Sequence, residues 1–160
     1  MIDLQNLSAY RESDRIEAKK ALGGLPESLW ETYSAFANTD GGLILLGVGE
    51  DPADKGFYPV PLADPDLLLE EFLEKLADPA IVSENILRQT DARLVTAEGM
   101  PIVAIFVPKA TAAQRPVYIG TDPFSGSYWR SGDGDFRMHP DVVRGMLAER
   151  EKAAKTPPEE

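Results

Sequence analysis

The stretch that decides the fold is AFANTDGGLILLGVG, residues 35–49. Its first part ends a helix whose apolar face includes Leu29, Tyr33 and Phe36 at helical spacing. Two glycines then stop the helix, and the apolar residues 43–48 follow as a run too short for an independent helix. Because short apolar runs bounded by glycines indicate buried strands, the sequence predicts a helix, a tight turn and a central strand.

Alternating patterns along the rest of the chain indicate the fold class. Further elements are expected as strands at residues 15–19, 57–60, 92–97, 102–107, 117–119 and 127–130, a loop at 131–135, and helices at 65–76 and from 140 onward. Hairpins are frequent, and strands and helices intermingle without a regular βαβ series. We therefore predict an α+β fold with a mixed, mainly antiparallel sheet and about three flanking helices.

The length of 160 residues fits one domain, which we place at residues 1–152, followed by a flexible tail or the start of a linker at residues 153–160. No apolar run approaches the roughly 20 residues that span a bilayer, and no basic-then-apolar leader opens the chain. Cysteine is absent, which excludes disulfides and thiolate metal sites. These features predict a cytoplasmic protein that does not associate with a membrane.

The net charge of -11 is unevenly distributed along the chain. Residues 1–56 carry five basic and ten acidic side chains, whereas residues 101–160 carry eight of each. A phosphate-binding surface is therefore expected in the last third, together with local basic clusters such as Arg15, Lys19 and Lys20. Because phosphate neutralisation supplies most non-specific affinity, the acidic balance argues against tight binding of DNA or RNA and predicts weak binding.

Three glutamates form the first candidate site. Strand alternation would place Arg15, Glu17 and Lys19 on one face of the first strand, and Glu50 lies just past the apolar strand. If these strands are neighbours, Glu12, Glu17 and Glu50 converge. Three carboxylates suit Mg²⁺ or Mn²⁺ in phosphodiester cleavage, with Lys19 holding a phosphate. On spacing alone, solvated glutamates with a surface ion pair are the more common outcome, because carboxylates are mostly exposed.

The second candidate site combines aromatic and basic residues of the last third with two lysines of the first strand. Aromatic rings beside arginines can stack on bases while the arginines contact phosphates. The alternative is that alternate residues of two strands fill the core while the arginines remain in water. The candidate nucleic-acid-binding residues are Lys19, Lys20, Lys109, Arg115, Tyr128, Arg130 and Arg137.

The glycine-rich segments do not match a nucleotide-binding loop. Gly41-Gly42 and Gly47-x-Gly49 lack both the Lys-Ser/Thr of the phosphate loop and the six-residue dinucleotide fingerprint. Glycine is therefore expected at these positions as a turn residue. With one histidine and no cysteine, a zinc site is not expected either.

Several motifs together resemble the Schlafen-type AlbA-like domain. They are ESxxxExK at residues 12–19, AFANTDGG at 35–42, LGV at 46–48, RPVYIG at 115–120 and YWRSG at 128–132. The resemblance covers about residues 10–150 of the chain. Bacterial members are also called divergent ATPase-like domains and DNA-binding domains. The resemblance implies an α+β domain found in bacterial proteins described as transcriptional regulators, commonly followed by other modules.

The resemblance also bears on the acidic residues. In animal Schlafens the related region cleaves transfer and ribosomal RNA with three acidic residues, which correspond here to Glu12, Glu17 and Glu50. This sequence has Gly49-Glu50 where the family often has two aspartates, so the third carboxylate is one methylene longer. The animal domain carries a zinc site of cysteine and histidine, which cannot form here because cysteine is absent.

These observations lead to three interpretations. The first is a nucleic-acid-associated domain of a bacterial transcriptional regulator. The second is a metal-dependent endoribonuclease in which Glu12, Glu17 and Glu50 bind Mg²⁺ or Mn²⁺ and Lys19 contacts phosphate. The third is a protein-interaction or oligomerisation module. We also expect a homo-oligomer, because the animal form pairs two such lobes in one chain whereas this chain holds one.

Overall fold

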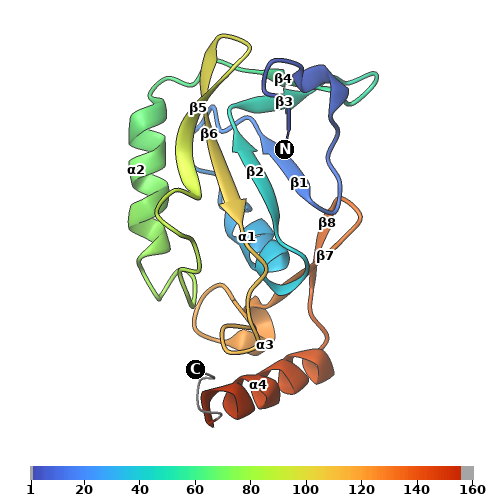
Figure 1. Cartoon of the computed structure of the whole chain (residues 1–160), viewed down its shortest axis with the longest axis vertical. Coiled ribbons are helices and arrows are strands. Elements are labelled where there is room, and N and C mark those ends of the chain that lie inside the picture. Colours follow the sequence, from blue (N-terminus) through green and yellow to red (C-terminus); the bar gives the residue numbers. More distant parts are fainter. Residues whose placement is uncertain (1, 156–160) are drawn as a thin grey trace, which may run out of the picture.

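The computed structural model describes residues 2–155 and has a four-stranded sheet at its centre (Figure 1). The strands, in spatial order, are β1 (Ile16–Lys19), β2 (Gly42–Leu46), β6 (Met100–Val107) and β5 (Ala92–Ala97). The other elements are η1 (Leu7–Ala9), α1 (Leu29–Asn38), β3 (Val48–Glu50), β4 (Phe57–Pro59), α2 (Pro65–Leu76), α3 (Pro123–Gly126), β7 (Tyr128–Ser131), β8 (Gly134–Arg137) and α4 (Pro140–Lys155). β1 is parallel to β2, whereas the β2–β6 and β5–β6 pairs are antiparallel. The predicted α+β class with a mixed, mainly antiparallel sheet is confirmed.

Residues 35–49 run from α1 into the middle of the sheet. Gly41, with φ +76, makes the turn between them, and a Cβ there would lie 2.7 Å from the carbonyl oxygen of Val107. The prediction of a single strand over residues 43–48 is wrong. Gly47, with φ +94, takes a backbone conformation that ends β2, and β3 turns away to pair with β4 in a separate two-stranded sheet.

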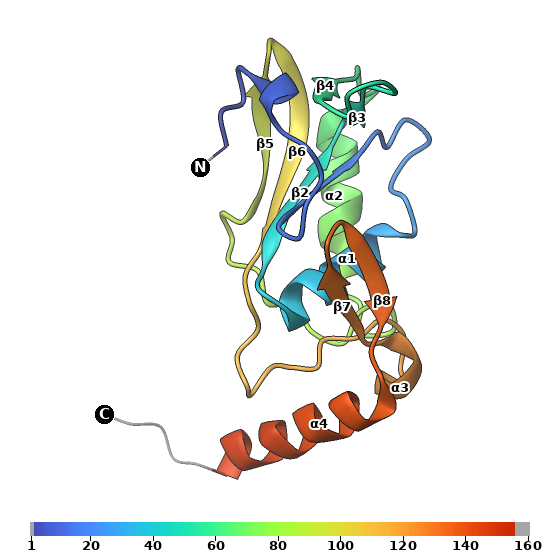
Figure 2. The same cartoon turned by 90° about the vertical axis from the view of Figure 1, so that its right-hand side faces the viewer.

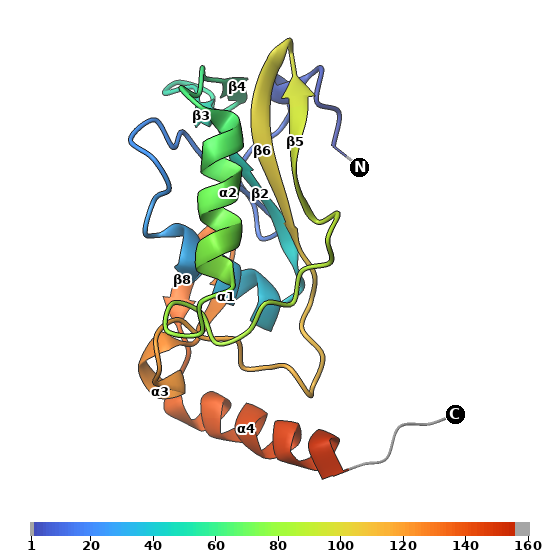
Figure 3. The ribbon, with the colours of Figure 1, turned by 90° about the vertical axis from the view of Figure 1, so that its left-hand side faces the viewer.

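Two helices cover one face of the central sheet. Figures 2 and 3 show α2 on one side of the sheet and the N-terminal segment on the other. Phe36 of α1 and Phe72 of α2 are fully buried in one core with Ile44 of β2 and Ile105 of β6. Because side chains alternate across a strand, these two sheet residues share the helix-covered face.

The opposite face of the sheet is covered at one end only. η1 and the β3–β4 pair pack there, and Leu7 and Phe57 are buried in a second core with Leu45 and Ile102 of the sheet. Toward the other end the face is open, and Phe106 of β6 remains 38% exposed. The sheet therefore has one helix-covered face and one face that is partly open to solvent.

The hairpin β7–β8 packs against α1 near the C-terminal end of the chain. The predicted pairing of residues 117–119 with residues 127–130 is confirmed only as an isolated antiparallel bridge between Tyr118 and Ser127, and not as a pair of strands. Instead β7 pairs with β8, which begins inside the predicted loop at residues 131–135. Gly132, with φ +57, forms the tight turn that makes this local pairing possible.

The last helix, α4, continues past the predicted domain boundary at residue 152 and runs to Lys155, so the boundary is corrected. The rest of the predicted tail, residues 156–160, lies outside the described residues. Figure 2 shows α4 beyond the end of the sheet and apart from α2. Neither α4 nor another described helix has the length and apolar character that crossing a bilayer requires.

Candidate functional site

The three glutamates of the first candidate site lie around the β1 edge of the sheet. Glu17 belongs to β1, Glu12 precedes the strand, and Glu50 ends β3, which contacts β1. The Glu12 carboxyl accepts a hydrogen bond from the Ala18 N–H at 3.0 Å, which holds the preceding segment against the strand. Glu12 also shares a side-chain hydrogen bond with Glu17 and interacts with the charge of Glu50. The three carboxylates therefore share one electrostatic environment.

This environment favours the protonated form of Glu12. Burial, the hydrogen bond with Glu17 and the negative charges of Glu17 and Glu50 raise the pKa of Glu12 to about 8. The hydrogen bond from the Ala18 N–H lowers the pKa, but the other effects outweigh it. At neutral pH this environment therefore favours the protonated form of Glu12, which can donate a hydrogen bond to Glu17.

Arg130 of β7 binds the opposite side of Glu17. Its Nη1 donates to Glu17 Oε1 at 2.9 Å and to Asp135 Oδ1 at 2.8 Å, and its Nη2 donates to the Ser13 carbonyl at 2.8 Å. The guanidinium also lies 4.8 Å from the ring centroid of Phe36. Burial alone would lower the pKa of Arg130, but the hydrogen bonds and charges of Asp135 and Glu17 raise it above its usual value.

The position of Arg130 corrects one sequence prediction. The residue is 2% exposed, and its guanidinium donors are directed to protein acceptors. The expected contact between Arg130 and nucleic acid is therefore wrong, because the side chain has no surface to offer a phosphate or a base. Its role is structural: it fastens the β7–β8 hairpin to β1 and α1.

The contacts of the three glutamates bear on whether they could hold a divalent metal ion. Glu17 is paired with Arg130 and lies 3.8 Å from Lys19, so two cationic side chains already compete for its carboxylate. A hard cation needs several anionic oxygens directed at one point. Across residues 2–155, no three side chains of His, Asp or Glu are placed so that they could hold one ion. The metal-ligand role of Glu12, Glu17 and Glu50 therefore remains a prediction that this geometry does not favour.

Lys19, the predicted phosphate contact, belongs to the same network. Its Nζ donates to the Ser28 hydroxyl at 3.0 Å, and the side chain is 14% exposed. The ammonium thus lies between Ser28 and Glu17, and the side chain is mostly covered by protein.

The remaining predicted nucleic-acid-binding residues do not form one surface. Lys20 is exposed beside β3, whereas Lys109 and Arg115 pair with carboxylates at 3.9 and 3.5 Å. Tyr128 and Arg137 lie opposite each other on the β7–β8 hairpin and line a cavity of about 550 Å³. Of this set, Tyr128 and Arg137 share a cavity, and binding of nucleic acid by the other residues stays a prediction.

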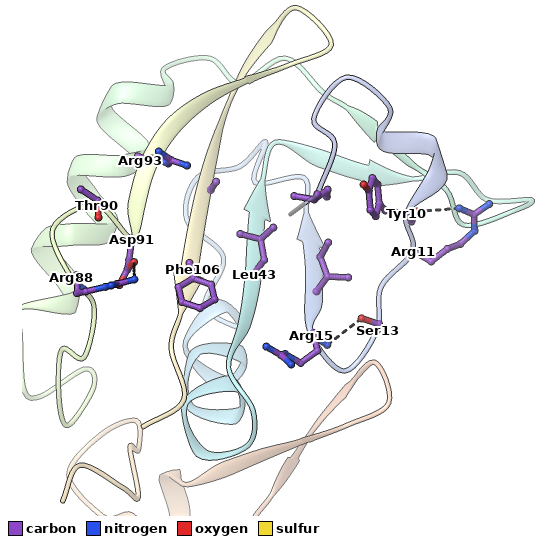
Figure 4. Close-up of a pocket in the computed structure, with 13 residues that line it drawn as sticks. Tyr10, Arg11, Ser13, Arg15, Leu43, Arg88, Thr90, Asp91, Arg93 and Phe106 are labelled. Atoms are coloured by element: carbon purple, nitrogen blue, oxygen red, sulfur yellow. Dashed lines mark hydrogen bonds and ion pairs between the residues drawn. The ribbon is translucent and has the colours of Figure 1, made fainter. Parts of the chain in front are cut away.

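A different set of basic residues surrounds the open face of the sheet (Figure 4). Arg11, Arg15, Arg88 and Arg93 line a trough of about 820 Å³ on this face. Asp91 is the only carboxylate among the described residues of the trough, and it is occupied by Arg88 at 3.3 Å. Neither Arg15 nor Arg93 has a carboxylate partner within residues 2–155. The trough is therefore positively charged although the chain carries a net charge of -11.

The floor of this arginine-lined trough is apolar because three strands place side chains in register. Ile16 of β1 is opposite Leu43 of β2, and Leu43 is opposite Phe106 of β6, so the three side chains form a row across the sheet. Arg15 immediately precedes β1, and Arg93 comes from β5 at the other edge. Figure 4 shows Leu43 and Phe106 between Arg15 on one side and Arg93 on the other.

Sequence reasoning did not identify this trough. It places Arg15 on one face with Glu17 and Lys19, whereas in the structure Arg15 lines the open face and Glu17 contacts the hairpin on the other side. It gives no role to Arg93 or Phe106, because alternation assigns a residue to one of two faces without saying which strands are neighbours. A usable signal was present: Arg93 is the only charged residue in the strand at residues 92–97.

Comparison with known proteins gives the family. The family model described as Schlafen, AlbA_2 matches residues 12–139. The chain belongs to the Schlafen AlbA_2 family. The resemblance that the motifs predicted is thereby confirmed.

Two solved structures resemble this Schlafen AlbA_2 domain. One is the N-terminal domain of a protein from Nitrosomonas europaea named as related to the ATP-dependent DNA helicase RecG; it is 31% identical, and the match covers 86% of this chain and 94% of that one, with a TM-score of 0.60. The DIP2311 protein from Corynebacterium diphtheriae shares the fold at 19% identity and a TM-score of 0.50, and the match covers 78% of this chain and 22% of that one. Among curated proteins, none matches this chain.

The motifs that carry the family resemblance meet at the end of α1. The side chain of Asn38, in AFANTDGG, accepts a hydrogen bond from the Val117 N–H at 2.8 Å and donates to the Tyr128 carbonyl at 3.0 Å. Val117 belongs to RPVYIG and Tyr128 to YWRSG. Arg130, also in YWRSG, joins Glu17 of ESxxxExK. In this Schlafen AlbA_2 domain, the motif residues hold the sheet, α1 and the hairpin together.

Proposed function

We propose that this Schlafen AlbA_2 domain binds nucleic acid through the arginine-lined trough on the open face of its sheet. The observation that carries the proposal is the placement of four arginines around an apolar floor with a single, already paired carboxylate. Arginine is the side chain best suited to phosphate, because its planar fork donates two hydrogen bonds at once. The name of the Nitrosomonas europaea neighbour, which refers to a DNA helicase, supports the same class of ligand.

The net charge of -11 limits the strength of this binding. Long-range repulsion from the acidic surface opposes any polyanion, so only the local field of the trough favours binding. Arg15 and Arg93 contribute most to that field, because Arg11 and Arg88 are partly neutralised by Asp54 and Asp91. We therefore expect micromolar rather than nanomolar affinity and a shallow dependence on salt.

The test is fluorescence anisotropy of a labelled oligonucleotide, titrated with the full chain between about 50 and 200 mM salt. We expect binding that weakens with salt and that falls in the double variant Arg15→Gln/Arg93→Gln. The control is Arg144→Gln/Lys155→Gln, which removes two positive charges from exposed positions on α4. Equal binding by the two double variants, or affinity independent of salt, would overturn the proposal.

The finer interpretations also stay predictions. A place in a transcriptional regulator is consistent with a nucleic-acid-binding module, and its test is a sequence preference among DNA sites. The endoribonuclease requires cleavage of structured RNA with Mn²⁺ that Glu17→Ala abolishes. Homo-oligomerisation requires a dimer mass by light scattering. The arginine-lined trough supports a place in a transcriptional regulator more than it supports endoribonuclease activity or homo-oligomerisation.

A further inference from the structure

We infer that the arginine-lined trough takes single-stranded nucleic acid, with unpaired bases against its floor and phosphates on the arginines at its sides. The inference rests on the proposed function and adds the class of ligand. It is drawn from the shape and chemistry of the trough. An apolar row of side chains crosses three strands, the row includes one exposed aromatic ring, and arginines lie on both sides of the trough.

The apolar floor is the feature that favours binding of single strands over binding of duplexes. Bases in a duplex are stacked and paired inside the helix, so the duplex presents mainly phosphates and sugars to a flat protein surface. A floor made of Ile16, Leu43 and Phe106 would gain nothing from those groups. Unpaired bases have free π-faces that stack on aromatic rings without regard to sequence. Phe106, 38% exposed in the middle of the sheet, is placed to provide such a ring.

The width of the trough agrees with one strand. Arg15 immediately precedes β1 and Arg93 lies in β5, and these are the two outer strands of the four-stranded sheet. Neighbouring strands are about 4.8 Å apart, so three spacings separate the outer strands by about 14 Å. A row of bases lying on Leu43 and Phe106 therefore has an arginine within reach on either side for the phosphates.

The trough is also closed at one end. Ile2 and Tyr10 of the N-terminal segment line it, and the Tyr10 hydroxyl accepts a hydrogen bond from the Asp3 N–H at 2.6 Å. The same segment covers the neighbouring part of the sheet through Leu7, which is fully buried. A bound strand is thus confined to the open part of the face, and only a few nucleotides can contact it at once.

The experiment compares three labelled probes of one sequence, a single-stranded DNA, a single-stranded RNA and the DNA duplex, each titrated with the full chain by anisotropy. We expect either single strand to bind at least about tenfold more tightly than the duplex. Phe106→Leu keeps an apolar side chain but removes the ring, and we expect it to weaken single-strand binding at least about fivefold without changing duplex binding.

The matched control is Phe124→Leu, because Phe124 has the same 38% exposure and lies on α3. Circular dichroism and thermal midpoints verify that both variants fold. Equal affinity for single strands and duplex, or equal effects of the two phenylalanine variants, would overturn the inference while leaving the proposed function intact if Arg15→Gln/Arg93→Gln still weakens binding. Absence of salt-dependent binding to all three probes would overturn both. A preference between the RNA and DNA strands reports contact with the 2′-hydroxyl.

Discussion

The guanidinium of Arg130 and the carboxylate of Glu17 form a buried ion pair, with 2.9 Å between Nη1 and Oε1 and a separation of 113 positions in the chain. One carboxylate oxygen of Glu17 thereby contacts the β7–β8 hairpin, and Glu17 also interacts with Glu12 and Lys19. The acidic motif near the N-terminus and the arginine of the late motif are thus parts of one structural unit.

Loss of Arg130 should destabilise the fold strongly. Arg130→Met leaves Glu17 and Asp135 buried or half-buried without their cation, and breaking such a pair costs about 3–5 kcal/mol. Urea denaturation of the variant should show a lower free energy of unfolding with an unchanged m-value. The control, Arg144→Met, removes an exposed arginine on α4 and should cost about 0–1 kcal/mol. Similar losses for both variants would mean that the Arg130 network contributes little.

The protonation of Glu12 should make stability depend on pH. Its pKa rises from 4.5 to about 8 in the folded protein, so the folded state holds this proton more tightly than the unfolded state. The stabilisation is complete below the unfolded pKa and is lost as the pH rises toward 8. In Glu12→Gln the midpoint of urea unfolding should therefore fall less between pH 5 and pH 8 than in the unsubstituted protein.

The other acidic groups also respond to pH, so this comparison needs a matched variant. Glu151→Gln makes the same change at a side chain that is 70% exposed, and it should keep the steeper fall of the unsubstituted protein. A Glu12→Gln profile that is parallel to that of Glu151→Gln would show that Glu12 has an ordinary pKa.

Divalent metal should have little effect on the stability of this domain. A ligand that binds only the folded state raises the thermal midpoint in proportion to its affinity. Because Glu17 is already paired with Arg130 and lies near Lys19, millimolar Mn²⁺ should leave the midpoint at pH 7 unchanged within a degree or so. A concentration-dependent rise that disappears in Glu50→Gln would instead support the three-carboxylate site and the endoribonuclease interpretation.

Local patterns predicted much of the fold. An apolar run bounded by glycines predicted β2, and two β-branched runs on either side of Gly99 predicted the β5–β6 hairpin. Both predictions succeeded because each signal lies within a short segment of the chain. The strand break at Gly47 was not predictable from composition, since it depends on a positive φ at one glycine among several. The sequence does carry a signal for the β7–β8 pairing, because Gly132 lies in a tight turn between Ser131 and Gly134. The same glycine-rich composition is also typical of a loop, which is the structure predicted for residues 131–135.

The candidate site shows the limit of such patterns. The proximity of Glu12, Glu17 and Glu50 depends on few elements: β2 pairs with β1, and β3, which ends at Glu50, directly follows β2 in the chain. The trough depends instead on the antiparallel register of β2 with β6, which sets Leu43 opposite Phe106. Residues 63 positions apart in sequence carry no local signal of that pairing. The sequence therefore indicated where charge lies along the chain, and only the strand order showed where it gathers in space.

Asn38 at the end of α1 should tolerate no carboxylate. Its side chain is 5% exposed; the amide nitrogen donates to the carbonyls of Val117 and Tyr128, while the amide oxygen accepts from the Val117 N–H. Asn38→Asp keeps the oxygen that accepts from the Val117 N–H. It replaces the amide nitrogen by a second oxygen, which repels the carbonyl oxygens of Val117 and Tyr128, and it buries a negative charge.

We expect Asn38→Asp to lower the free energy of unfolding by at least about 2 kcal/mol, because two buried carbonyls lose their partner. The matched substitution is Asn85→Asp at an exposed position where the side-chain oxygen only accepts a hydrogen bond, from the Leu87 N–H at 2.9 Å. There the carboxylate can do the same, so the change should be within about 0.5 kcal/mol of zero. Chemical denaturation of the two variants measures the difference directly. If Asn38→Asp unfolded at the same denaturant concentration as Asn85→Asp, the amide of Asn38 would not be what joins α1 to the RPVYIG and YWRSG segments.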